Sequence, residues 1–130
     1  MPVTVSLLRH MRLYLMQNMP MNRKVPLRIR TLMKELKAAL VRIYGDKLKG
    51  VYLYGSYARG DYRAGSDVDV MILLKDFKDY WKEWQRSSAY VSDISLEYDV
   101  TVSCILIKEI QWKEADKPVL HSIRREGLPA

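Results

Sequence analysis

The chain has 130 residues, of which 48% are hydrophobic and 28% are charged. This length fits one domain, and this composition excludes an intrinsically disordered chain because enough apolar side chains are present to build a core. The formal net charge of +7 favours acidic partners such as nucleic acid, nucleoside triphosphates or an acidic protein surface, although a basic balance can also serve solubility alone.

Cysteine usage and hydropathy narrow the class further. Cys104 is the only cysteine, which excludes a disulfide framework within one chain, and its apolar neighbours favour a core position. These features favour a reducing, cytoplasmic setting. The longest apolar runs, such as residues 68–74, are far shorter than the roughly 20 residues of a membrane-spanning helix, so we expect no membrane association.

Residues 1–22 form an N-terminal extension whose role the sequence does not define, and residues 23–130 are expected to form a single domain. Charges interrupt the apolar stretch of the extension, which is not typical of a signal peptide. Five of the seven methionines lie at or before Met21. This distribution suggests the hypothesis that translation can start at Met19 or Met21.

The first half of the domain predicts a helix followed by two strands. Pro26 is expected in the first turn of the helix, and Gly45 is expected to end it. Apolar residues recur between them at helical spacing: Ile29, Leu32, Met33, Leu36, Leu40 and Ile43. Residues 51–54 and 67–74 are rich in β-branched and aromatic side chains and predict strands, with turns around Gly60 and Gly65.

The second half predicts a helix, a third strand and a final helix. Aromatic residues between Phe77 and Trp84 have helical spacing, which favours core packing over a stacking platform for bases. The β-branched segment from Ser95 to Ile107 predicts the third strand, whose alternation places Asp99 on its polar face. A last helix is expected from Pro118 to a stop at Gly127. This order of elements predicts an α/β or α+β domain with a small mixed sheet.

The candidate phosphate-binding and metal-binding residues gather in the stretch GSYARGDYRAGSDVDV, residues 55–70. Gly55 permits close approach of the backbone, and Ser56 offers its N–H at an expected helix start, where phosphate is favoured. Asp67 and Asp69 share one face of a strand because side chains alternate, and two such carboxylates repel unless a cation lies between them. Mg²⁺ prefers these oxygen ligands together with substrate phosphates. Asp99 offers a third carboxylate from the neighbouring strand.

This pattern, G-S-x₁₀-D-x-D, resembles the signature of the polymerase-beta-like nucleotidyltransferase superfamily. The shortness of the chain and its ending at residues 119–128 look more specifically like the minimal nucleotidyltransferase antitoxins of HEPN/MNT toxin–antitoxin systems. The resemblance implies a mixed sheet with packed helices, with Gly55 and Ser56 holding the triphosphate and Asp67 and Asp69 holding Mg²⁺. Asp99 would complete the metal-binding and catalytic triad and act as the base.

The resemblance further implies transfer of AMP from ATP to a hydroxyl, a tyrosine of the cognate HEPN ribonuclease toxin in antitoxins of this kind. Direct nucleic-acid binding is not required for that reaction, and a homodimer is possible. Arg59 could contact phosphate oxygens, or it could pair with Asp61 or Asp67. Tyr57 and Tyr62 could line the nucleotide pocket.

Two alternatives stay open. The acceptor could be a small molecule or an RNA end, although the chain is short for the accessory domains that those acceptors usually require. The chain could also neutralise its partner by contact alone, through its basic surface and the aromatic residues from Phe77 to Trp84. The sequence does not define the acceptor, the nucleotide preference, the number of AMP units added or the oligomeric state.

Overall fold

The computed structural model describes residue 9 and residues 24–130. The expectations for residues 1–22, including an alternative start at Met19 or Met21, lie outside the described residues apart from residue 9. None of the helices in the described part is both long and apolar enough to cross a membrane.

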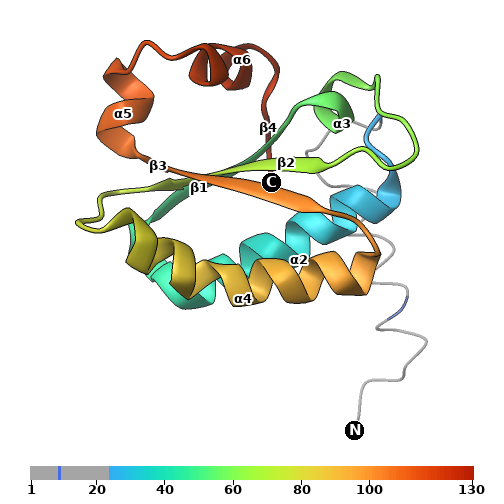
Figure 1. Ribbon diagram of the computed structural model, residues 1–130, viewed down its shortest axis with the longest axis horizontal. Coiled ribbons are helices and arrows are strands. Elements are labelled where there is room, and N and C mark those ends of the chain that lie inside the picture. Colours follow the sequence, from blue (N-terminus) through green and yellow to red (C-terminus); the bar gives the residue numbers. More distant parts are fainter. Residues whose placement is uncertain (1–8, 10–23) are drawn as a thin grey trace, which may run out of the picture.

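A four-stranded mixed sheet forms the centre of the molecule (Figure 1). Its strands are β1 (Leu48–Tyr54), β2 (Val68–Leu74), β3 (Val102–Lys108) and the short β4 (Leu128–Pro129). The strand order is β3-β2-β1-β4, in which β1 runs antiparallel to β2 and β4, and β2 runs parallel to β3. The mixed sheet expected from the sequence is therefore confirmed. Six of the seven residues of β2 are buried, which explains its nearly continuous apolar sequence.

Two long helices cover one face of the sheet (Figure 1). They are α2 (Leu27–Tyr44), which is capped at its C-terminus by Gly45 as expected, and α4 (Tyr80–Tyr98). The apolar stripe of α2 predicted from its spacing is buried almost completely, and it packs with the inward side chains of β1, β2 and β3. This face contains the main core.

Two short helices, α5 (Glu109–Glu114) and α6 (Pro118–Glu126), lie on the opposite face (Figure 1). They form a smaller core in which Leu120 and Ile123 pack with Met71 and Leu73 of β2. A third short helix, α3 (Ser56–Arg59), follows β1 directly. A 3-10 turn (Gly45–Lys47) precedes β1. The expected final helix from Pro118 to Gly127 is confirmed, since Gly127 caps α6.

The predicted third strand begins too early in the sequence. Helix α4 continues to Tyr98, and β3 starts only at Val102, so the expectation that Ser95 opens a strand is wrong. The helix extends because Ser87, Val91 and Ile94 recur at helical spacing and are all buried. Burial of this stripe outweighs the local preference of the β-branched residues for a strand.

The predicted core position of the aromatic residues from Phe77 to Trp84 is correct only in part. Phe77 and Trp84 pack against the main core. Tyr80 and Trp81 stay in solvent, with exposed fractions of 39% and 70%. This pair opens α4, whose start is fixed by the Asp79 side chain, which accepts hydrogen bonds from the N–H groups of Trp81 and Lys82.

Candidate active site

The hairpin of β1 and β2 brings the Gly55 turn and the carboxylates together. Tyr54, the last residue of β1, is the antiparallel partner of Asp69 on β2. Directly opposed residues of two strands point to the same face of a sheet. The Asp69 side chain therefore lies beside the point where the chain leaves β1 and enters α3.

Gly55 and Asp69 are packed so closely that no other residue fits at position 55. Gly55 has φ 75° and ψ −154°, a combination that residues with a side chain rarely adopt. A Cβ atom added there would lie 3.1 Å from the Asp69 Cγ and would overlap its carboxylate oxygen. The Asp69 carboxylate occupies the space that a side chain at position 55 would fill.

Helix α3 begins directly after the Gly55 turn, at the carboxylate end of the sheet. The N–H groups of Ala58 and Arg59 donate to the Gly55 carbonyl at 3.1 and 3.0 Å. Helix geometry leaves the earlier N–H groups, those of Ser56 and Tyr57, without acceptors inside the helix. The predicted helix start at Ser56 is confirmed, and N–H groups in this position suit a phosphate.

Asp67 and Asp69 form a pair of negative charges that the Arg59 charge offsets only in part. Asp67 directly precedes β2 and follows a tight turn in which the Ser66 N–H donates to the Arg63 carbonyl at 3.0 Å. Partial burial raises the pKa of Asp69, the charge of Asp67 raises it further, and the Arg59 charge opposes this shift. A divalent cation would offset both the cost of keeping the partly buried Asp69 carboxylate charged and its repulsion from Asp67. Carboxylates are the hard oxygen ligands that Mg²⁺ prefers. These residues therefore fit the implied metal.

Arg59 is engaged by two carboxylates at the rim of the site. Its Nε lies 3.2 Å from the Asp61 Oδ2, and its Nη1 lies 3.0 Å from the Glu126 Oε1. These hydrogen bonds raise the pKa of the Arg59 guanidinium, with the Asp61 bond as the larger cause. The pairing with Asp61 that the sequence left open is present, while contact with phosphate stays a prediction. Sequence reasoning missed Glu126, which is 67 residues away in the chain.

Asp99 lies at the end of a helix, not on a strand. It caps α4 in the left-handed conformation, with φ 49° and ψ 52°, and its N–H donates to the Leu96 and Ser95 carbonyls. The predicted placement on the polar face of the third strand is wrong, because α4 extends to Tyr98. Asp99 instead lines a cavity of about 440 Å³ together with Arg28, Tyr57, Gly65, Ser66 and Thr101.

Ser103 occupies the position on β3 that lies beside Asp69. The two residues are register partners in the parallel pair, so their side chains share a face, and Ser103 is exposed. Among the residues that the structure describes, no three Asp, Glu, His or Cys side chains gather closely enough to hold a metal ion. This finding gives no support to a set of three ligands that includes Asp99, and metal binding by the carboxylate pair stays a prediction. Correct strand boundaries would have revealed Ser103 by alternation from buried Cys104.

One of the two tyrosines expected at the nucleotide pocket, Tyr57, lines the cavity, and Tyr62 does not. Tyr57 is buried and lines the cavity beside Ser66, and its ring stacks on Tyr62 with centroids 4.6 Å apart. Tyr62 is 38% exposed. The stack ties the loop after α3 to the wall of the cavity.

Comparison with known proteins defines the class. The family model described as "Nucleotidyltransferase domain" matches residues 33–124, which include β1, α3, β2, α4 and β3. The chain therefore belongs to this family of nucleotidyltransferase enzymes.

Individual relatives narrow the comparison. A Methanocaldococcus jannaschii protein named as a candidate protein adenylyltransferase is 46% identical over 78 residues, which are 60% of this chain and 78% of that protein. The protein adenylyltransferase MntA of Shewanella oneidensis is 32% identical over 75 residues, which are 55% of this chain and 54% of MntA. The chain thus aligns with about half the length of MntA.

Solved structures share the fold at lower sequence identity. A nucleotidyltransferase candidate from Sulfolobus solfataricus has a TM-score of 0.58 and 21% identity, over 86% of this chain and 90% of that one. A toxin–antitoxin crystal structure with AMP-PNP has a TM-score of 0.53 and 22% identity, over 74% of this chain and 70% of that one. These similarities support the fold.

Proposed function

We propose that this chain is a Mg²⁺-dependent protein adenylyltransferase. It transfers AMP from ATP to a hydroxyl, a tyrosine in our proposal, of a cognate HEPN ribonuclease toxin and so acts as its antitoxin. The observation that carries the proposal is the close packing of the Gly55 turn against the Asp69 carboxylate. This packing supports our proposal that the turn binds phosphate and that the neighbouring carboxylate pair binds the metal.

Each residue of the site has a defined part in this proposal. Asp67 and Asp69 would hold Mg²⁺, which when bound neutralises the charge of the triphosphate. The N–H groups at Gly55 and Ser56 would bind phosphate oxygens at the start of α3. Arg59 would exchange its exposed bond with Asp61 for a phosphate oxygen while Glu126 keeps its guanidinium in place.

The reaction is an in-line displacement at the α-phosphorus of ATP. The acceptor oxygen forms a new bond to the α-phosphorus, the bond from that phosphorus to the bridging oxygen breaks, and pyrophosphate leaves. We assign the acceptor proton to Asp99, because its carboxylate lines the cavity next to Ser66 and is not grouped with the carboxylate pair. On this assignment Asp99 faces the acceptor and does not bind the metal.

The related proteins support the acceptor class. MntA is named as a protein adenylyltransferase, and a similar fold occurs in a toxin–antitoxin complex with AMP-PNP, an analogue of ATP.

The test is a labelling experiment with the product of the gene next to the one that encodes this chain, which we take as the cognate toxin. The wild-type protein is incubated with that partner, Mg²⁺ and ATP labelled at either the α- or the γ-phosphate. We expect label on the partner from α-labelled ATP only, and loss of label in the presence of a chelator. Label from γ-labelled ATP would indicate phosphorylation and would contradict the proposal, as would neutralisation of the partner without any label.

Asp99→Asn separates the role of Asp99 from that of the metal-binding pair. We expect the transfer rate to fall roughly 100-fold, with the pH dependence of the rate flattened and the affinity for Mg²⁺ unchanged. Weaker Mg²⁺ binding in Asp99→Asn would assign Asp99 to the metal instead.

A further inference from the structure

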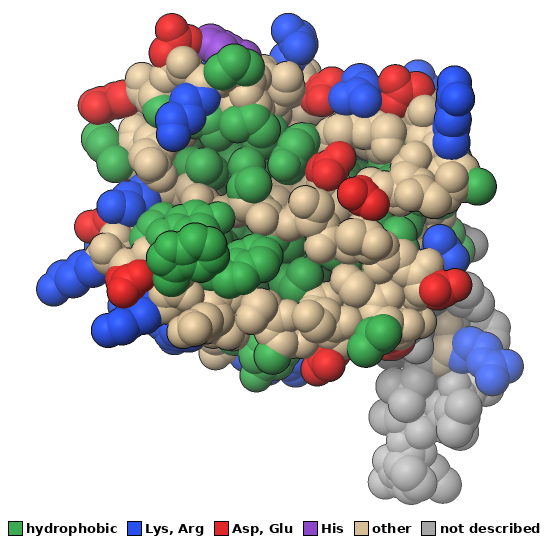
Figure 2. Space-filling model, in the orientation of Figure 1, with side chains coloured by type: hydrophobic (Ala, Val, Ile, Leu, Met, Phe, Trp, Pro, Cys, Tyr) green, Lys and Arg blue, Asp and Glu red, His purple; other side chains and the backbone are tan. Residues whose placement is uncertain are grey.

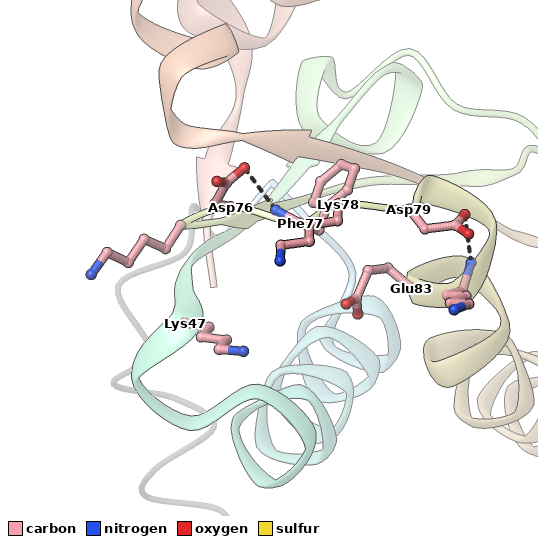
Figure 3. Close-up of a pocket in the computed structure, with 8 residues that line it drawn as sticks. Lys47, Asp76, Phe77, Lys78, Asp79 and Glu83 are labelled. Carbon is pink, nitrogen blue, oxygen red and sulfur yellow. Dashed lines mark hydrogen bonds between the residues drawn. The ribbon is translucent and has the colours of Figure 1, made fainter.

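A second cleft lies at the opposite end of β2 from the carboxylates. It has a volume of about 460 Å³ and is formed by the end of the 3-10 turn, the loop after β2 and the first turn of α4 (Figure 3). Four exposed lysines line it, namely Lys47, Lys75, Lys78 and Lys82. We call it the lysine cleft. In Figure 3 the ammonium groups of Lys47 and Lys78 point toward its centre.

The backbone holds the two sides of the lysine cleft together. The Lys75 N–H donates to the Lys47 carbonyl at 2.7 Å, directly beyond the register pair of Leu48 and Leu74. The cleft is therefore anchored to the end of the β1–β2 hairpin, and its four lysine side chains are exposed. An anchored backbone lined by long, exposed lysines suits an extended ligand that offers several negative charges.

Each of the three acidic residues that line the cleft has a partner other than the four cleft lysines. Asp79 caps α4, Asp76 accepts from the Phe77 N–H at 2.8 Å, and Asp76 also lies 3.8 Å from the Lys108 ammonium. Glu83 lies 3.4 Å from the Arg86 guanidinium. By contrast, within the described part of the chain none of the four cleft lysines has a carboxylate within 4.0 Å. Their charges remain available to a ligand.

Exposed aromatic rings continue the cleft along the start of α4. The rings of Phe77 and Tyr80 meet edge to face at 6.1 Å, and those of Tyr80 and Trp81 do so at 5.7 Å. Phe77 lines the cleft, while Tyr80 and Trp81 lie outside it in solvent. Figure 2 shows this end of the molecule, at the left, with Lys and Arg side chains and also Asp and Glu side chains around a hydrophobic patch.

We propose that the lysine cleft binds single-stranded nucleic acid. Phosphates of the backbone would contact the four lysines, and unpaired bases would stack on Trp81 and Tyr80. A purely acidic protein segment would use the lysines but would leave these rings exposed, so the aromatic pair favours nucleic acid. The site would operate independently of adenylylation, since Lys75 follows Asp69 by six residue steps along β2, a separation of about 20 Å.

Fluorescence anisotropy of the full chain tests this proposal. The probes are labelled 12-mers of oligouridylate and oligodeoxythymidylate, titrated at several salt concentrations. The cleft variant replaces Lys75, Lys78 and Lys82 with Ala, and the matched control variant replaces Lys34, Lys113 and Lys117 with Ala. We expect the cleft variant to bind roughly 10–100-fold more weakly, with a salt slope shallower by about 2, and the control to bind like wild type.

Two further measurements fix the kind of ligand. Trp81→Ala is expected to weaken binding about tenfold without changing the salt slope, because stacking is not ionic. Equal binding of both probes would indicate recognition of the phosphate backbone. Tighter binding of the uridylate would indicate a contact with the ribose 2′-hydroxyl. Either result supports the proposal. Equal weakening in the cleft and control variants would overturn it. So would displacement of the probe by polyglutamate of the same length at equal concentration, which would assign the cleft to an acidic protein.

Discussion

The two ends of β2 are built on opposite principles. At its start, Asp69 packs against a turn that only glycine can form, and partial burial together with the nearby charge of Asp67 raises the pKa of Asp69. Just beyond its end, Lys75 and its neighbours lie on exposed side chains, with one backbone hydrogen bond holding the cleft together. The first end is acidic and packed against a constrained turn, and the second end is lined by exposed lysines.

This difference teaches how chemistry and binding divide within a small domain. Catalysis needs charges fixed to within fractions of an ångström, which requires register, burial and a special backbone conformation. Binding of a flexible polyanion needs only charges in reach. A single central strand provides both because its two ends face away from each other, so the two sites can be altered separately.

The largest expected effect comes from removing the carboxylates. Asp67→Asn with Asp69→Asn should lower AMP transfer by at least about 1,000-fold, because no ligand for the metal remains at the triphosphate. The far-ultraviolet circular dichroism and the binding of the oligonucleotide at the lysine cleft should stay unchanged. Loss of oligonucleotide binding in this variant would show that the two ends do not act separately.

The next largest effect should come from the Gly55 turn. In Gly55→Ala the added Cβ must displace the Asp69 carboxylate, so transfer should fall roughly 100-fold and the free energy of unfolding by about 1–3 kcal/mol. Gly45→Ala is the matched control, since Gly45 also has a positive φ of 53° but nothing within 4 Å of an added Cβ.

Steady-state kinetics and denaturant unfolding of both variants test this contrast. The control should lose stability through backbone strain alone and keep its transfer rate. An active Gly55→Ala enzyme would mean that the Asp69 carboxylate need not stay where the turn places it.

Much of the carboxylate end could be predicted from the sequence, because its signals are local. Gly55, Ser56, Asp67 and Asp69 lie within 15 residues, and alternation along one strand is enough to place the two carboxylates on one face. The partner of Arg59 could not be predicted in full, since Glu126 comes from the far end of the chain.

Asp99 and Trp81 show where local signals mislead. The β-branched residues after Ser95 favour a strand, but burial of Val91 and Ile94 against the sheet extends α4 and moves Asp99 to a helix cap. Helical spacing likewise favoured a core position for Trp81, yet the face of α4 that meets the sheet is defined by Ser87, Val91 and Ile94. Tertiary packing, which a single sequence does not reveal, decided both cases.

Ser103 offers a way to sharpen the acidic end. Ser103→Asp would place a third carboxylate beside Asp69 on the neighbouring strand, so the affinity for Mn²⁺ in the absence of nucleotide should rise about tenfold. Isothermal titration calorimetry measures this affinity directly. Ser92→Asp, an exposed position on α4, is the matched control and should bind Mn²⁺ like wild type. Equal affinities in all three proteins would mean that Ser103 does not face the pair.

The smallest expected effect concerns stability. The raised pKa of Asp69 means that its ionisation opposes folding, so its contribution to stability is fully present below the pKa of an unfolded Asp and is lost as pH rises through the folded pKa. Without divalent ions at pH 7, Asp69→Asn should therefore raise Tm by roughly 1–3 °C, a small gain because the side chain is partly solvated.

At pH 3 this gain should disappear, since Asp69 is then protonated in both states. Asp93→Asn, on the exposed face of α4, serves as the control and should leave Tm unchanged at both pH values. A lower Tm for Asp69→Asn at pH 7 would indicate that Asp69 stabilises the fold and is not a strained ligand.

The most direct test is a crystal structure of this protein grown with Mn²⁺ and a non-hydrolysable ATP analogue. We expect an anomalous peak between the Asp67 and Asp69 carboxylates, with the triphosphate on the N–H groups at the start of α3. A triphosphate held instead by the lysines at the far end of β2, with no peak at the two aspartates, would contradict the assignment of the active site.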